Sequence, residues 1–266
     1  MSFALPLLQP STVPPSVQDG TLDAAGERAY RVFGAELAAE MGLQLSLPQV
    51  VIATAQVLFQ RYLHRVSLRA CDAHCVVMGA LYLAGKVEEC CRPMRAIVNV
   101  CHAAMLRRKG GAPAPPALGG RLYLHWKQAL IQAERDLLKE LGFQVYQGVS
   151  QQHAHKFLLY FVRFLGGSAG LAQAAWSALN DSLRLDLCLR HPPEVIACAA
   201  IALGAARTAF PLPQRVPWHA VFGASEGDLA AVVGAIEDLY RAPRAVGWLP
   251  SLRPDWSARD EQDDEA

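Results

Sequence analysis

The sequence contains an internal repeat, and this repeat constrains the fold more than any other feature. Shifted by 120 residues, CVVMGALYLAGK (75–86) aligns with VIACAAIALGAA (195–206). Shifted by 102 residues, QALIQAERDLL (128–138) aligns with AAVVGAIEDLY (230–240). Apolar residues recur every three or four positions in these segments, which is typical of the buried face of a helix. A repeat of about 110 residues is too long for one unit of a solenoid, so it indicates a duplicated helical domain.

Helical patterns fill most of the chain, and no convincing run of alternating strand residues interrupts them. Ser46-Leu47-Pro48-Gln49 resembles a capping box that opens one helix, whose face would be Val51, Ala55, Leu58 and Tyr62. The other helices are expected over about 23–41, 72–92, 94–107, 121–142, 150–165, 168–186, 194–209 and 226–241. The predicted fold class is therefore all-α, with two helical bundles in tandem.

The bundles are expected over residues 23–146 and 147–243. Residues 1–22 include four prolines and several serines and threonines, which favours a disordered lead-in. Residues 244–266 form an acidic tail whose last twelve residues, 255–266, hold six acids and one arginine. We expect these last twelve residues to be solvated rather than to dock on the bundles.

Composition excludes several classes of protein. The 266 residues are 52% hydrophobic, enough for a sizeable core, and the net charge of +1 argues against a dedicated nucleic-acid binder. The longest apolar runs are near a dozen residues, short of the roughly 18–20 that cross a bilayer. The seven cysteines are odd in number and mostly lie in apolar helical patterns, which favours reduced core residues in an intracellular protein. No phosphate-binding, nucleophile-elbow or zinc-protease motif is present, so we expect neither an enzyme nor a bound cofactor.

Two charged residues occupy helix positions where the repeat has apolar ones. Lys86 continues the stripe of Val76, Gly79 and Leu83, and it aligns with Ala206 of the second copy. Glu134 lies on the stripe of Leu130, Leu138 and Leu141 in the 121–142 helix, and it aligns with Ile236. Charges on a buried face are costly unless something meets them, and the second copy indicates that the fold does not need them.

The residues alone leave two explanations open for this pair. Both side chains could reach solvent or pair with each other, contributing about 0–1 kcal/mol at a surface. Alternatively, they form a two-point clamp in a groove between two helices, where the ammonium donates to carbonyls of an incoming segment and the carboxylate accepts from its amides. Gly79 and Gly85 favour close helix approach in the same region.

Two further clusters have simpler explanations. His153-Ala154-His155 could hold a metal, but no second group of ligands accompanies it, and we expect no metal site. Arg107-Arg108-Lys109 could contact phosphate or assist nuclear import, although three charges at a loop edge are more often solvated.

LAGKVEE followed by AERDLLKELGF resembles the cyclin box, and several longer segments are similar to cyclin L. They include LPQVVIATAQVLFQRYL (47–63), WSALNDSLRLDLCLRHPPEVIACAAIALGAAR (176–207) and FPLPQRVPWHAVFGAS (210–225). The resemblance covers about residues 23–241. It implies two five-helix cyclin boxes in tandem.

The same resemblance implies a function. Lys86 and Glu134 match the lysine and glutamate with which cyclins grip a kinase, and Leu83 and Ile131 are their apolar neighbours. The implied partner is a cyclin-dependent kinase, and the implied role is that of a nuclear regulatory subunit in RNA polymerase II transcription and pre-mRNA splicing. The alternative is a TFIIB-like or scaffold protein that uses tandem bundles to hold nucleic acid or other proteins. Neither a membrane nor direct nucleic-acid contact is expected for a cyclin.

Overall fold

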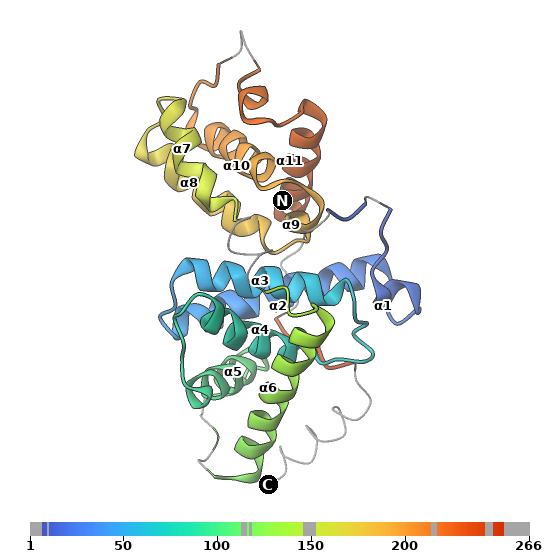
Figure 1. The fold of residues 1–266 in the computed structure, drawn as a ribbon. Coiled ribbons are helices and arrows are strands. Elements are labelled where there is room, and N and C mark those ends of the chain that lie inside the picture. The colour runs from blue at the N-terminus through green and yellow to red at the C-terminus, as the bar shows by residue number, and fades with distance from the viewer. Residues whose placement is uncertain are drawn as a thin grey trace. The chain divides into compact units, whose positions relative to one another are not determined.

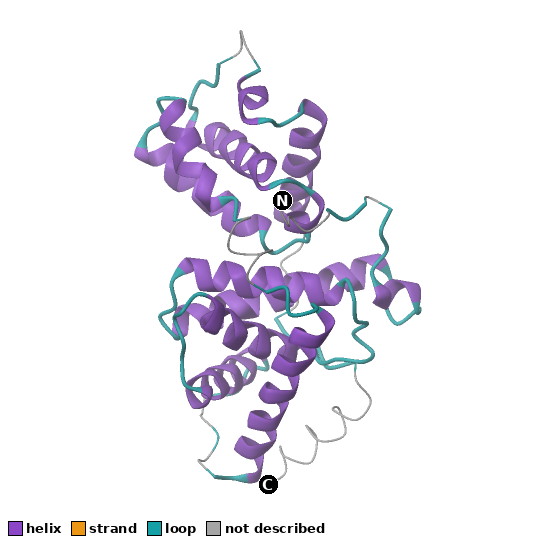
Figure 2. Cartoon of the chain, viewed as in Figure 1, coloured by secondary structure: helices purple, strands orange, loops and turns teal. Residues whose placement is uncertain are grey.

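A computed structural model describes residues 7–9, 11–112, 116, 119–145, 153–213, 217–242 and 247–252. Helices dominate these ranges and no strand occurs within them, which confirms the prediction of an all-α protein (Figures 1 and 2). The chain divides into two compact units, one made of residues 11–147 with 245–266, the other of residues 1–10 with 148–244.

The first unit contains a bundle of five helices, which we call the first bundle. They are α2 (Ala24–Gln44), α3 (Gln49–Leu63), α4 (Ala73–Val87), α5 (Met94–Arg108) and α6 (Arg121–Glu140). Helix α4 packs against all four others and is buried along nearly its whole length. It begins where the Asp72 carboxylate accepts from the backbone N–H of Cys75 at 3.0 Å, an N-cap that satisfies an otherwise unpaired donor.

The second unit contains the second bundle. Its elements are α7 (His155–Phe164), α8 (Ala169–Ser182), α9 (Leu187–Arg190), α10 (Pro193–Thr208), the 3-10 helix η1 (Trp218–Phe222) and α11 (Glu226–Arg241). Helix α10 is the central one and packs against α7, α8 and α11. Among the described residues, the short η1 has the place in the chain order that α5, the fourth helix, has in the first bundle. The two copies are therefore not alike in every element.

The repeat in the sequence therefore corresponds to a repeat in the structure. Helix α10 starts and ends 120–121 residues after α4, and both are the central helices of their bundles. Helix α11 ends 101 residues after α6, close to the offset of 102 in the sequence. The Ser225 hydroxyl caps α11 by accepting from the backbone N–H of Asp228 at 3.1 Å.

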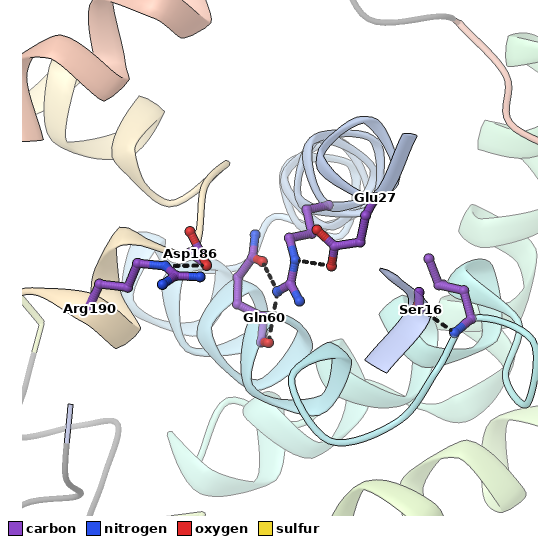
Figure 3. Close-up of polar contacts among 7 residues, drawn as sticks. Ser16, Glu27, Gln60, Asp186 and Arg190 are labelled. Carbon is purple, nitrogen blue, oxygen red and sulfur yellow. Dashed lines mark hydrogen bonds and ion pairs between the residues drawn. The ribbon is translucent and has the colours of Figure 1, made fainter. Parts of the chain in front are cut away.

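Polar groups inside the first bundle are bonded to each other. The Arg31 guanidinium donates to the Glu27 carboxylate in the same helix, and also to the side-chain oxygen of Gln60 at 2.9 Å and to its carbonyl at 3.1 Å (Figure 3). All three residues are buried. Because a buried charge is costly unless it is paired and hydrogen-bonded, this network favours one docking of α2 on α3.

Two details near the N-terminus differ from the expectations. Residues 15–18, placed in a disordered lead-in, form helix α1 (Pro15–Gln18), and the buried Ser16 hydroxyl accepts from the backbone N–H of Leu68 at 2.9 Å (Figure 3). The predicted capping box is wrong. Ser46 lies in the left-handed region with φ of 51°, and α3 begins after Pro48 without a side-chain cap.

The described residues at the N-terminal end, 7–9, belong to the second unit and contact its helix α9. The backbone N–H of Leu8 donates to the carbonyl of Leu189 at 2.8 Å, and Arg190 donates to the carbonyl of Gln9 at 3.2 Å. Arg190 also pairs with Asp186 at 2.7 Å (Figure 3). The first few described residues are thus held by α9.

Candidate partner-binding site

Helices α4 and α6 pass close to each other at Gly79. A Cβ on Gly79 would lie 2.8 Å from the Cβ of Ala133 and 3.0 Å from its carbonyl carbon, closer than real Cβ contacts. Glycine is therefore required for this approach, as expected from the sequence. Gly85 differs, because a Cβ there would meet the carbonyl oxygen of Cys90 at 3.3 Å, in the turn that follows α4 rather than in another helix.

The close approach places the two anomalous charges together. Lys86, in the last turn of α4, donates from Nζ to Glu134 Oε1 of α6 at 2.5 Å. The Lys86 side chain is 42% exposed, whereas that of Glu134 is 14% exposed. Lys86 Nζ also lies 4.2 Å from the centre of the Tyr82 ring, a cation–π distance. Of the two explanations left open by the sequence, mutual pairing occurs in the unbound chain.

Lys86 stays protonated near neutral pH. Burial by itself lowers the pKa of Lys86, but the hydrogen bond and the charge of Glu134 outweigh it, so the pKa is raised above its usual value. An ammonium carries three donors and a carboxylate has two oxygens, so one bond between them leaves capacity on both sides. A half-exposed lysine beside a largely buried carboxylate can therefore offer a donor and an acceptor to one incoming backbone segment.

The two apolar residues expected beside the pair lie differently. Leu83 is 4% exposed and belongs to the core, where it supports α4 from inside rather than offering a contact surface. Ile131 is 39% exposed and precedes Glu134 by one turn of α6. Sequence reasoning missed Leu124, which is 48% exposed and seven residues before Ile131, a spacing that places both on one helix face.

The remaining clusters are used within the chain. His155 Nε2 lies 2.8 Å from the side-chain oxygen of Asn180, and no group of three potential metal ligands occurs among the described residues. Arg107 and Arg108 of α5 both pair with Glu40 of α2, at 2.8 and 2.9 Å, so these two arginines support the packing of the first bundle. Among the helices that the structure describes, none combines the length and apolarity needed to span a membrane.

Comparisons with known proteins agree with this architecture. Residues 27–146, which include nearly all of the first bundle, match the family model of the cyclin N-terminal domain. Over 228 residues the chain is 40% identical to Cyclin-L2 of Mus musculus, covering 85% of this chain and 43% of the relative. It is 39% identical to Cyclin-L1 of Homo sapiens over 220 residues, covering 82% of this chain and 41% of the relative. The chain thus spans somewhat over two fifths of the length of these relatives.

A solved structure shares the fold. A chain in the crystal structure of the yeast RNA Pol II CTD kinase CTDK-1 complex superposes with a TM-score of 0.73 and 17% sequence identity, covering 98% of this chain and 84% of that chain. The first bundle is therefore a cyclin domain. Within that class, the chain is a cyclin L-like protein.

Proposed function

We propose that the chain binds and activates a cyclin-dependent kinase through the face of the first bundle that carries Lys86, Glu134 and Ile131. The observation that supports this most directly is the contrast between the copies. The second bundle has Ala206 and Ile236 at the aligned positions, so the fold tolerates their apolar equivalents. A pair that the fold does not require, partly exposed and next to an exposed isoleucine, is suited to contact a partner.

In this proposal, the cyclin performs no chemistry itself. A helix of the kinase and the segment beside it dock on α4 and α6, where Lys86 donates to backbone carbonyls and Glu134 accepts from amides. Docking favours the kinase conformation in which its own Lys–Glu pair forms and its activation loop is ordered. The free energy of docking is thereby used to shift the kinase toward its active state.

The wider role is part of the same proposal. Residues 23–146 and 147–243 would be the two cyclin boxes, the first binding the kinase. Similarity to Cyclin-L1 and Cyclin-L2, and the shared fold with a chain of an RNA polymerase II CTD kinase complex, support a nuclear role in RNA polymerase II transcription and pre-mRNA splicing. The internal use of the Arg107–Arg108 cluster favours this role over direct binding of nucleic acid.

The test is the affinity of a purified cyclin-dependent kinase for single variants. Lys86→Ala and Glu134→Ala should each weaken binding by about 2–4 kcal/mol, because each leaves its partner group desolvated and unpaired. Arg135→Ala is the matched control, since Arg135 is an exposed cation next to Glu134 on α6, and it should bind like the wild type. Equal affinity of the wild type and both site variants for a kinase that the wild type binds and activates would contradict the proposed site.

A further inference from the structure

Residues 247–252, which we call the C-terminal segment, lie on the first bundle although they follow the second bundle in the sequence. They were expected to belong to the C-terminal tail, 244–266, and the structure shows that they contact this bundle. The acidic end, 255–266, which was expected to be solvated, lies outside the described residues. The contacts come from α2, from residues at the start of α4 and from Lys109, the residue that follows α5.

Trp248 is the apolar anchor of this segment. Its ring stacks on the imidazole of His74, with centres 4.6 Å apart and planes 23° apart. The Trp248 and Phe33 rings are arranged edge-on, with their centres 6.3 Å apart. Lys109, directly after α5, places Nζ 4.8 Å from the centre of the Trp248 ring. Such stacked, edge-on and cation–π arrangements add specific geometry to the burial of a large side chain.

Polar bonds hold the segment at Pro250 and Ser251. The Tyr30 hydroxyl, on α2, donates to the Pro250 carbonyl at 2.8 Å. The Ser251 side chain hydrogen-bonds the carboxylate of Asp72, which is buried and also accepts from the backbone N–H of Cys75 at 3.0 Å. The same carboxylate faces His74 Nδ1 at 3.2 Å. Burial by itself raises the pKa of Asp72, but His74 and these hydrogen bonds outweigh it and hold the pKa below its ordinary value.

The segment therefore contacts the capping group of the helix that carries Lys86. Asp72 caps the start of α4 and Lys86 is in its last turn, so the two residues are about 21 Å apart along the helix at 1.5 Å per residue. The first N–H groups of a helix have no partner within the helix. In α4 the Asp72 carboxylate accepts from one of them, and Ser251 and the His74–Trp248 stack hold this carboxylate in place.

We propose that residues 247–252 dock on the surface of the first bundle that is formed by Tyr30, Phe33, Asp72, His74 and Lys109, and that they clamp the N-terminal end of α4. The occupant is this segment of the same chain, because aromatic, cationic and hydrogen-bonding partners for it are present together. The clamp is separate from the kinase-binding face, and it makes the first cyclin domain dependent on residues beyond the second bundle. This inference does not require the proposed kinase partner.

Two truncations of the full chain test the clamp. Ending the chain after residue 246 removes the C-terminal segment, whereas ending it after residue 252 keeps all its described contacts and serves as the matched control. We expect the first truncation to lower the unfolding midpoint of the first bundle by about 5–10 °C. It should also speed hydrogen exchange in residues 73–80 of α4. The longer truncation should behave like the full chain.

Substitutions keep the proposal testable if the shorter chain does not fold. Trp248→Ala in the full chain should speed hydrogen exchange at the start of α4 at least tenfold, and Tyr30→Phe should do so more weakly. Exchange at the start of α10, the corresponding helix of the second bundle, should stay unchanged in both variants. An unchanged rate at the start of α4 in Trp248→Ala, or equal midpoints for the two truncations when both fold, would overturn the proposal.

Discussion

The central helix pair of the first bundle and that of the second bundle have the same place in the fold but different chemistry. In α4 and α6 the aligned positions are Lys86 and Glu134, joined by a 2.5 Å ion pair. In α10 and α11 they are Ala206, which is exposed, and Ile236, which is fully buried. The second bundle folds without an ion pair at these positions, so the ion pair is not a requirement of the architecture. The ion pair is therefore a feature of the first bundle and not of the fold as such.

The backbone shows a related difference. Gly79 of α4 faces Ala133 of α6 so closely that a Cβ has no room. The aligned residue of α10 is Ala199, whose Cβ is fully buried and accommodated. The close approach in the first bundle brings Glu134 within reach of Lys86, so the glycine and the ion pair belong to one arrangement.

The largest effect is expected when the charge of the first bundle is introduced into the second. Ile236→Glu places a carboxylate at a fully buried position where Ala206 offers no ammonium. It should destabilise the second bundle by about 3–5 kcal/mol, as unpaired buried charges do. Ile236→Val is the control and should cost about 0.5–1.5 kcal/mol. Urea unfolding measures both changes in stability. A loss of stability with Glu no larger than with Val would show that water reaches position 236.

The two bundles should also respond differently to acid. Burial, together with the nearby His155, lowers the pKa of His153 to about 4. Because the folded pKa lies below the ordinary 6.5, the unfolded state takes up the proton first. Stability from this histidine is complete above pH 6.5 and falls by about 3 kcal/mol as the pH drops toward 4.

Asp72 of the first bundle affects stability only at lower pH than His153 does. Its folded pKa is held below the ordinary 3.8, so its contribution is present above that pH and is lost only at lower pH. Between pH 6.5 and 4 these two groups therefore weaken the second bundle alone. Urea unfolding at pH 7, 5.5 and 4.5, with each bundle followed by hydrogen exchange, measures this, and His153→Gln should flatten the response. Equal losses in both bundles would contradict the assignment.

A smaller effect is expected at the helix crossing. Gly79→Ala forces the Ala133 side chain and the α6 backbone to shift, and should destabilise the first bundle by about 1–3 kcal/mol despite the better helix propensity of alanine. Gly234→Ala in α11 is the matched control, because a Cβ there meets nothing within 4 Å, and it should stabilise by up to about 1 kcal/mol. Thermal unfolding of the two variants should shift in opposite directions. Shifts in the same direction would show that the crossing is looser than it is in the structure.

Much of the fold could be predicted because helical periodicity is a local signal. It placed α11 at its observed bounds of 226–241, and the αL stop at Gly142 is present with φ of 61°. The face of α6 was less well predicted. Its buried residues are Trp126, Leu130, Ala133 and Leu137, so Leu138 and Glu134 lie beside the buried stripe rather than on it. Leucines occur on more than one face of this helix, so the sequence alone fits more than one buried face. Only packing against α4 selects between them.

The contacts of the C-terminal segment could not be predicted from periodicity. GWLPSL contains glycine and proline and forms no regular element, so nothing in it resembles a helix or strand pattern. Its docking depends on groups far away in the sequence, such as Tyr30 and Lys109. The role of the Arg107–Arg108 cluster was missed for the same reason, since its partner Glu40 is more than sixty residues earlier.

The most direct test converts the first pair into the second. The double variant Lys86→Ala, Glu134→Ile has the residues of α10 and α11 at these positions, and its affinity for a purified cyclin-dependent kinase is measured by calorimetry beside its own unfolding. We predict a first bundle that still unfolds cooperatively, with a kinase Kd raised by about 30- to 1,000-fold, equivalent to about 2–4 kcal/mol. A folded double variant that binds the kinase as tightly as the wild type would contradict the account.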